Sequence, residues 1–159
     1  MTIQVGARIP DVPLDVLGDG VEQISTRALF AGRKLVLFCV PGAFTPTCSE
    51  RHLPGYVESF AAFRQRGVDL ACIAVNDAYV MAAWAKAQGV PSGLQMLADG
   101  NAQFVRALGL EMDASKYGMG VRGKRFALYA EDGVVKHLAV EAPGELRVSN
   151  AAVMLAAIS

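Results

Sequence analysis

The chain has 159 residues, of which 53% are hydrophobic and 19% charged, a composition that favours one packed core and excludes a disordered chain. Fifteen basic residues balance fifteen acidic ones, so the net charge offers no attraction for nucleic acid or for an anionic membrane surface. We therefore expect a single domain over residues 1–159 that binds neither and acts on small or weakly charged partners.

The N-terminal segment bears on location. Residues 1–13 lack the basic cluster and apolar run of a secretory signal peptide. The longest apolar run, residues 35–40, is too short to span a bilayer. Cys39, Cys48 and Cys72 show no C-x-x-C spacing, and in a reducing compartment they should be free thiols. From these features we expect a cytoplasmic protein.

Two apolar runs predict the centre of a sheet. Residues 34–40 (KLVLFCV) and 68–75 (VDLACIAV) are continuously apolar, as strands buried on both faces are. Between them, residues 45–66 carry apolar side chains at three- and four-residue steps, which predicts a helix. A strand, a helix and a strand in this order form a βαβ unit, so the two strands should be parallel neighbours.

The second half of the chain predicts further helices and a hairpin. The expected elements are a helix over 78–88 capped by Asp77 and stopped by Gly89, a strand at 94–98, a helix at 101–108, strands at 125–130 and 134–140 around an Asp-Gly turn, and a helix at 151–158 capped by Ser149 or Asn150. This order gives an α/β domain with a mixed central β-sheet flanked by helices. It matches the thioredoxin-like fold, although other three-layer α/β domains share it.

Residues 41–50 (PGAFTPTCSE) are the chemically informative segment, since they follow the first buried strand and begin the first helix. Either Thr45 caps this helix with Pro46 at its first position, or Thr47 caps it with Glu50 completing a capping box. Both alternatives put Cys48 in the first turn. There the backbone N–H groups lack helical partners and the helix dipole favours an anion.

A cysteine in this position is expected to act as a nucleophile, because the thiolate is the attacking form. A helix terminus supplies only about 0.3–1 kcal/mol toward an anion, so a cation must add to it. Arg51 and His52 share the helix face of Cys48, and residues 122–125 hold a basic cluster. The spacing alone does not choose among these candidates.

The pattern Pro41-x-x-x-Thr45-x-x-Cys48 resembles the active-site motif of peroxiredoxins, and the longer string VPGAFTPTCSERHLPGY is similar to the peroxiredoxin 5 (type II) branch. Further similarity to that branch lies in the strings VNDAYVMAAW, LQMLADG and GVRGKRFALYAEDG. The resemblance covers nearly the whole chain. It implies a thiol peroxidase that needs no metal, haem or flavin cofactor.

The resemblance also implies roles for individual residues. Cys48 would be the peroxidatic cysteine, which hydrogen peroxide or an alkyl hydroperoxide converts to a sulfenic acid. Thr45 would donate its hydroxyl to the bound peroxide, Pro41 would shield the pocket from water, and Arg125 would be the catalytic arginine. Phe44 is expected to help admit alkyl hydroperoxides. The relatives form dimers near the active-site loops, so a homodimer is expected.

The reductant is left open by the sequence. Some members of the branch carry a late cysteine near the closing helix, but residues 144–149 contain none. Cys72 matches a position that acts in resolution in some members, yet it lies in an apolar run, as does Cys39, and both are expected to be core residues. We therefore expect a one-cysteine cycle recycled by glutathione and glutaredoxin. The alternative is a thioredoxin-dependent cycle in which Cys72 is the resolving cysteine.

Three other classes of protein use a similar cysteine. A thiol–disulfide reductase would carry a second cysteine within a few residues, and residues 49–51 offer none. A metal site on Cys48 and His52 lacks further ligands at suitable spacing. A redox sensor or binding protein that uses Cys48 remains, and catalytic turnover separates it from an enzyme.

Overall fold

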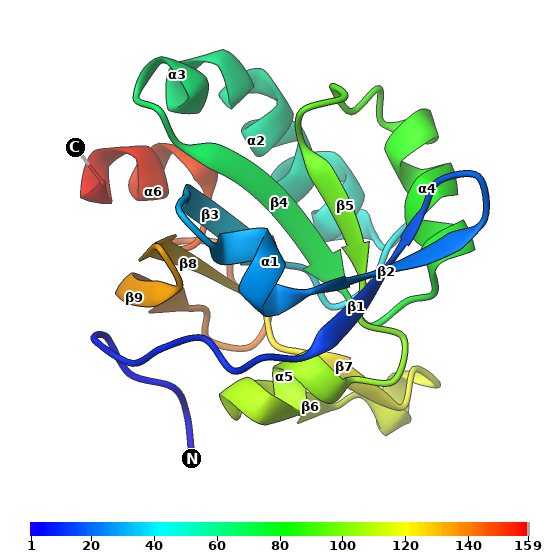
Figure 1. Cartoon of the computed structure of the whole chain (residues 1–159). Coiled ribbons are helices and arrows are strands. Elements are labelled where there is room, and N and C mark those ends of the chain that lie inside the picture. The colour runs from blue at the N-terminus through cyan, green and yellow to red at the C-terminus, as the bar shows by residue number, and fades with distance from the viewer. Residues whose placement is uncertain (159) are drawn as a thin grey trace.

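The computed structural model describes residues 1–158, and its centre is a seven-stranded mixed sheet (Figure 1). The strands lie in the order β2 (Val21–Ser25), β1 (Pro13–Leu17), β5 (Gln95–Ala98), β4 (Asp69–Ala74), β3 (Lys34–Cys39), β8 (Phe126–Glu131) and β9 (Val134–Val140). β3, β4 and β5 are parallel, and the remaining pairs are antiparallel. The expected mixed sheet and the parallel pairing of β3 with β4 are therefore confirmed.

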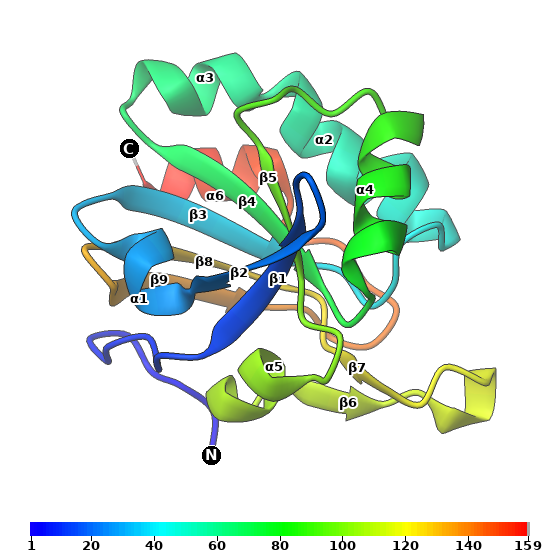
Figure 2. The same cartoon turned by 45° about the vertical axis from the view of Figure 1, so that its right-hand side comes forward.

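Helices cover both faces of the sheet, as Figure 2 shows. One face carries α2 (Leu53–Glu58), α3 (Phe60–Gln65), α4 (Ala78–Ala87) and α6 (Ala151–Ala157), and the other carries α1 (Thr26–Phe30) and α5 (Gln103–Leu108). Alternate residues of β3 supply the two cores, with Phe38 in the first and Leu37 and Cys39 in the second. Burial on both faces explains why β3 reads as a continuous apolar run.

Local signals fix the hairpin and two helix starts. Asp132 and Gly133 both have positive φ (49° and 79°), as the predicted two-residue turn between β8 and β9 requires. The Asp77 side chain accepts from the Val80 N–H at 2.8 Å and caps α4 as predicted. Of the two caps proposed for α6, Asn150 is the one formed, since its side chain accepts from the Val153 N–H at 3.0 Å.

The helical character predicted over residues 45–66 is confirmed, but the segment is not one continuous α-helix. After a short helical start, the chain forms the π-helical turn η1 (Cys48–His52), then α2, and then α3 beyond a break at Ser59. In η1 the Leu53 N–H donates to the Cys48 carbonyl, five residues back. Pro54 gives the physical reason, because it has no N–H to continue the ladder and its ring crowds the carbonyl four residues earlier.

The sequence pattern did not predict the β1–β2 hairpin, α1, or the small sheet of β6 (Glu111–Asp113) and β7 (Val121–Gly123). These elements are three to five residues long and mostly half-exposed, so they carry little hydrophobic periodicity. In Figure 2 the β6–β7 hairpin extends from the body beside α5. Within residues 1–158 no helix is both long and apolar enough to cross a membrane.

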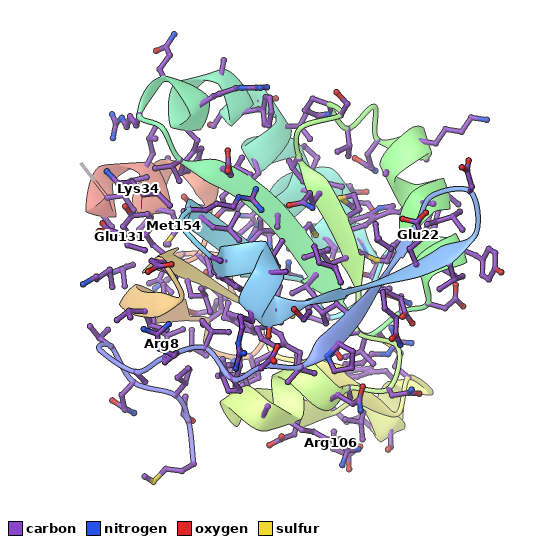
Figure 3. The ribbon with its side chains drawn as sticks, viewed as in Figure 1. Arg8, Glu22, Lys34, Arg106, Glu131 and Met154 are labelled. Carbon is purple, nitrogen blue, oxygen red and sulfur yellow. The ribbon has the colours of Figure 1, made fainter. Side chains whose placement is uncertain are left out.

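Charged side chains lie at the rim of this body. Figure 3 labels three such side chains, Arg8, Glu22 and Arg106, and each is exposed. The interior of the sheet layers is apolar by contrast. The site described next is therefore assembled at the ends of strands, where polar side chains reach the edge of both cores.

Candidate active site

Cys48 lies in the first turn after β3, and its side chain is fully buried. The helical start is at Pro46, and the first backbone bond four residues back runs from the Ser49 N–H to the Thr45 carbonyl at 2.9 Å. Thr45 therefore occupies the cap position, as in the first alternative, but its hydroxyl donates to the Gly42 carbonyl at 2.6 Å. The capping box expected from Thr47 is not formed. The Cys48 N–H precedes the first helical bond, at the positive end of the turn.

Arg125 is the cation that contacts the sulfur. Its Nη2 donates to Cys48 Sγ at 3.2 Å, and its Nη1 donates to His52 Nδ1 at 2.9 Å. The pairing of β3 with β8 explains the approach, since Cys39 pairs with Phe126 and Arg125 therefore lies level with the residue before Pro41. One guanidinium thus bridges two groups from a distant part of the sequence.

His52 adds no positive charge beside the sulfur. Burial, and then the charge of Arg125, lower the pKa of His52 from its usual 6.5 to about 3. Arginine can only donate, so Nδ1 of the neutral ring is the acceptor and the proton sits on Nε2. That nitrogen donates to the Ser149 carbonyl at 3.1 Å. Arg51, the other candidate on the helix, is exposed.

The loop that precedes Cys48 is held from three directions. The Asn76 side chain accepts from the Ala43 N–H at 2.9 Å, Arg122 Nη1 donates to the Pro41 carbonyl at 3.4 Å, and Thr45 holds the Gly42 carbonyl. A Cβ on residue 42 would lie 3.1 Å from the Arg122 guanidinium and from the Thr45 methyl, so glycine fits this close approach. Two members of the basic cluster therefore have different partners: Arg122 donates to the loop, and Arg125 donates to the sulfur.

Phe44 is the strained member of this loop. Its φ is +64°, which costs a bulky residue about 1–3 kcal/mol, and its side chain is 56% exposed. The ring is not among the residues that line the cavity beside Arg125, and its expected part in admitting alkyl hydroperoxides stays a prediction. An exposed aromatic ring held in a strained conformation is instead available for contact outside the chain.

A cavity of about 520 Å³ opens beside Arg125. It is lined by Pro41, Thr47, Met112, Asp113, Lys116, Tyr117, Lys124, Arg125 and the segment Glu141–Glu145. The lining combines apolar surface with two exposed ammonium groups. The arrangement as a whole offers a buried sulfur, a bidentate cation beside it and an opening that leads to that cation.

Comparisons with known proteins agree with this geometry. The family model described as Redoxin matches residues 4–155. Peroxiredoxin-2E-2, chloroplastic, of Oryza sativa subsp. japonica is 48% identical over 164 residues, which cover 99% of this chain and 73% of that protein. The crystal structure of reduced Prx3 from Vibrio vulnificus in complex with H2O2 has a TM-score of 0.95 at 48% identity, covering 99% of this chain and 100% of that one. The chain belongs to the Redoxin family.

Within that family the chain is a peroxiredoxin, a thiol peroxidase with a thioredoxin-like fold. The structure of peroxiredoxin 5 from Alvinella pompejana has a TM-score of 0.87 at 36% identity and covers 98% of this chain and 97% of its own. The resemblance identified from the motif around Cys48 is confirmed.

The expected cytoplasmic location is overturned by these relatives. Peroxiredoxin-2E-2 of Oryza sativa and peroxiredoxin-2E of Arabidopsis thaliana, which is 46% identical over 99% of this chain and 70% of its own length, are both chloroplastic proteins. The physical reason for the error is that free thiols and a balanced charge suit any reducing compartment. They do not distinguish one such compartment from another.

The other two cysteines of this peroxiredoxin are buried free thiols. Cys72 on β4 packs in the same core as Cys48, whereas Cys39 packs in the core on the opposite face of the sheet. Burial raises the pKa of Cys39 and of Cys72 well above the usual value, and neighbouring negative charges add to this effect. Both are therefore protonated and poor nucleophiles in this conformation.

Sequence reasoning missed the residues that support Arg125 and His52 from behind. The Glu141 carboxylate accepts hydrogen bonds from the backbone N–H groups of Arg147, Val148 and Ser149 and from the Ser149 hydroxyl. Nothing in the local sequence marks Glu141, since a lone glutamate after a strand is common. Only the structure reveals its role, because a glutamate that is just 7% exposed must have buried hydrogen-bond donors around it.

Proposed function

We propose that this peroxiredoxin reduces hydrogen peroxide and alkyl hydroperoxides at Cys48, with no metal or organic cofactor taking part. The Cys48 thiolate attacks one peroxide oxygen, the O–O bond breaks, and the departing oxygen takes a proton to leave as water or an alcohol. The sulfur gains the attacked oxygen and becomes a sulfenic acid. The related Prx3 of Vibrio vulnificus, whose structure is in complex with H2O2, supports hydrogen peroxide as a substrate.

The contact that carries this proposal is the 3.2 Å hydrogen bond from Arg125 Nη2 to Cys48 Sγ. A guanidinium stays charged at all relevant pH values, so it stabilises the thiolate before attack and the departing oxygen during it. The N-terminal position of Cys48 adds the smaller contribution of the helix dipole. We assign Arg125 and Cys48 as the catalytic residues, and Pro41, in the loop that precedes Cys48, as the residue that keeps water from the sulfur.

The hydrogen bond of the Thr45 hydroxyl supports a different role from the donor role that the resemblance implied. Because the hydroxyl proton is donated to the Gly42 carbonyl, the Thr45 oxygen presents lone pairs and not a proton to a bound peroxide. We therefore propose that Thr45 accepts a hydrogen bond from the peroxide O–H, which orients the O–O bond toward the sulfur. Substrate binding then involves Thr45, Cys48 and Arg125, with Phe44 at the outer edge of the same loop.

An external thiol is the proposed reductant. The first thiol displaces the sulfenic oxygen as water and forms a mixed disulfide with Cys48. A second thiol then attacks the external sulfur of that disulfide, so that Cys48 leaves as the thiol and the two external thiols leave as a disulfide. Cys39 and Cys72 are ill suited to either step, because both are buried and protonated. The cavity beside Arg125 is large enough for a tripeptide, and its Lys116 and Lys124 form no ion pair within residues 1–158. These two ammonium groups, of which that of Lys116 lies 5.1 Å from the centre of the Tyr117 ring, suit the two carboxylates of glutathione, with glutaredoxin as the coupled partner.

The proposed unit of function is one peroxiredoxin domain over residues 1–159 that forms a homodimer. The support for the dimer is the exposure of Phe44 at 56% and of Tyr117 at 70%, two large rings next to the site. Sedimentation equilibrium of the parent and of Phe44→Ala tests this assignment. A parent that stays monomeric at high micromolar concentration would contradict it.

The central experiment follows peroxide consumption by the parent protein and by three variants, Cys48→Ser, Cys39→Ser and Cys72→Ser. Catalysis is expected to be lost in Cys48→Ser and retained in the other two, with glutathione plus glutaredoxin supporting turnover better than thioredoxin. Mass spectrometry of the oxidised parent should find a sulfenic acid or a glutathione adduct at Cys48. A Cys48–Cys72 disulfide at high yield would favour the thioredoxin-dependent cycle, and a single turnover without recycling would favour a redox sensor.

A further inference from the structure

The support behind Arg125 begins at Glu141, which directly follows β9. Its carboxylate gathers three successive backbone N–H groups and one hydroxyl at distances between 2.7 and 3.0 Å. These bonds fix the loop between β9 and α6, whose last residue before the cap of α6 is Ser149. Burial opposes the charged form, but the hydrogen bonds outweigh it and lower the pKa of Glu141 below its usual value. The carboxylate is thus a fixed, ionised anchor for the loop.

The fixed loop presents one carbonyl to two side chains of the facing helix. The Ser149 carbonyl accepts from the Tyr56 hydroxyl at 2.6 Å and from His52 Nε2 at 3.1 Å. Tyr56 and His52 are both buried, and both rings pack against Phe38 of β3. The His52 ring therefore has little freedom to turn. Its Nε2 faces the Ser149 carbonyl, which can only accept, and at 3.5 Å the Ser149 hydroxyl, whose proton is donated to Glu141.

The protonation state of the ring follows from these neighbours. A carbonyl at Nε2 requires the proton there, which leaves a lone pair on Nδ1 for Arg125. The opposite tautomer would point an N–H at the guanidinium and leave Nε2 facing a carbonyl without a proton between them. Both hydrogen bonds of the His52 ring would then be lost. The Nη1 arm of Arg125 would have no acceptor, and only the Nη2 arm would keep its contact with the Cys48 sulfur.

We propose that His52 and Glu141 are positioning residues, which orient Arg125 on the Cys48 sulfur through the hydrogen-bond chain Glu141–Ser149–His52–Arg125. This inference rests on the proposed roles of Cys48 and Arg125. Neither positioning residue touches the reacting atoms. Their effect is to hold one arm of the guanidinium so that the other arm stays 3.2 Å from Sγ. A misplacement of about 1 Å can cost roughly 100-fold in rate, so such support matters for catalysis.

Two substitutions of His52 test separately the roles of its two ring nitrogens, Nδ1 toward Arg125 and Nε2 toward Ser149. In His52→Asn the side-chain oxygen lies near the place of Nδ1 and keeps an acceptor for Arg125, whereas His52→Gln reaches toward Ser149 and leaves Arg125 without one. We expect kcat/KM for hydrogen peroxide to fall about 10- to 100-fold in His52→Gln and by less in His52→Asn. The pH at which half of Cys48 is ionised, measured from its alkylation rate, should move upward in His52→Gln and recover in His52→Asn. A purely structural role would lower stability in both variants without separating them in this way.

The far end of the chain is tested with Glu141→Gln. An amide adds its own N–H donors among four others, so the loop should loosen and Cys48 ionisation should move in the same direction as in His52→Gln. The matched control is Arg147→Gln, which changes an exposed side chain of the same loop but keeps its N–H bond to Glu141. If Glu141→Gln does not fold, the comparison of His52→Asn with His52→Gln still tests whether His52 positions Arg125.

The outcomes separate this inference from the proposed function. Parent-like kcat/KM and parent-like Cys48 ionisation in His52→Gln, together with an inactive Cys48→Ser and an impaired Arg125→Gln, would overturn the positioning chain alone. An active Cys48→Ser would instead overturn the proposed function. Equal losses in His52→Asn and His52→Gln would also count against the chain, because they would show that the acceptor beside Arg125 is not what matters.

Discussion

Arg125 acts through its shape as well as through its charge. One guanidinium arm holds Cys48 Sγ and the other holds His52 Nδ1, and a planar fork can satisfy two such acceptors at once. A lysine has the same charge but is a single point on a flexible stem. Charge near the sulfur and orientation at the sulfur are therefore separable properties of this residue.

We predict that Arg125→Lys lowers kcat/KM for hydrogen peroxide by roughly 100- to 1,000-fold, the usual cost of removing one oriented donor from a developing negative charge. The reason is that the ammonium cannot hold both acceptors and stay on the sulfur. Steady-state peroxide consumption at saturating reductant measures the effect. Arg51→Lys is the control, since Arg51 lies one turn from Cys48 and is exposed. An Arg125→Lys variant within a few-fold of the parent would show that charge alone suffices.

Two substitutions of Thr45 test separately the roles of its hydroxyl and its methyl group. Thr45→Ser keeps the oxygen that bonds the Gly42 carbonyl, and Thr45→Val keeps the volume but removes that oxygen. We predict that the valine variant loses about 10- to 100-fold in kcat/KM, the loss expected for one hydrogen bond to a group that carries charge, while the serine variant stays near the parent. Competition kinetics against a catalase of known rate would measure both. A valine variant as fast as the serine variant would remove Thr45 from the proposed substrate contacts.

The turn η1 is the element on which reduction by an outside thiol depends, because the sulfur that it carries is completely buried. Ser49, next to Cys48 in this turn, accepts from the indole N–H of Trp84 on α4 at 3.0 Å, and Trp84 is the only tryptophan of the chain. Opening of the turn must break this bond. The indole is therefore a natural reporter of the turn.

We predict that intrinsic fluorescence changes when peroxide oxidises Cys48 and returns to its starting value when glutathione reduces it. Stopped-flow mixing of the reduced protein with one equivalent of peroxide measures the first step. Cys48→Ser should show no change, and Ser49→Ala should show a smaller one because the indole has already lost its partner. A fluorescence signal that stays constant throughout the cycle would mean that the turn does not open.

The same elements show how far sequence reasoning reaches. The buried strands β3 and β4, the Asp-Gly hairpin and the cap of α4 follow from local chemistry, and each was predicted. The break of the long helix after Cys48 was not, because a three- and four-residue apolar pattern continues through Pro54. Cys48 itself follows from its place at a helix start. The approach of Arg125 depends on strand register, which spacing between residues 48 and 125 does not encode.

At the scale of the whole molecule, the site is assembled from four strand ends. The loop after β3 holds Cys48, Asn76 follows β4, Arg125 precedes β8 and Glu141 follows β9. These segments meet because β4, β3, β8 and β9 are neighbours in the sheet. The catalytic geometry therefore depends on the same packing as the stability of the fold. The buried His52 belongs to both, and its protonation can be followed through the free energy of unfolding.

The sign of that link follows from His52, whose pKa is about 3 in the folded chain and 6.5 when unperturbed. Between pH 6.5 and about pH 3, His52 is protonated in the unfolded chain and neutral in the folded chain. The free energy of unfolding must therefore fall as the pH falls. Glu141 acts in the same direction but only below its own usual range near 4.5, and Asp99, whose pKa burial raises, acts in the opposite direction. The window between about pH 6.5 and 5 lies above the usual range of Glu141, so the slope there reports His52 against the opposing effect of Asp99.

We predict that the parent loses about 1.4 kcal/mol of unfolding free energy per pH unit through His52 as the pH falls below about 6, and that His52→Asn lacks this loss. Urea unfolding at closely spaced pH values between 7 and 5 measures both slopes. His137→Asn is the matched control, since it removes the other histidine of the chain and leaves His52 in place. Parallel slopes for the parent and His52→Asn would show that the ring at position 52 takes up its proton as easily in the folded chain as in the unfolded one.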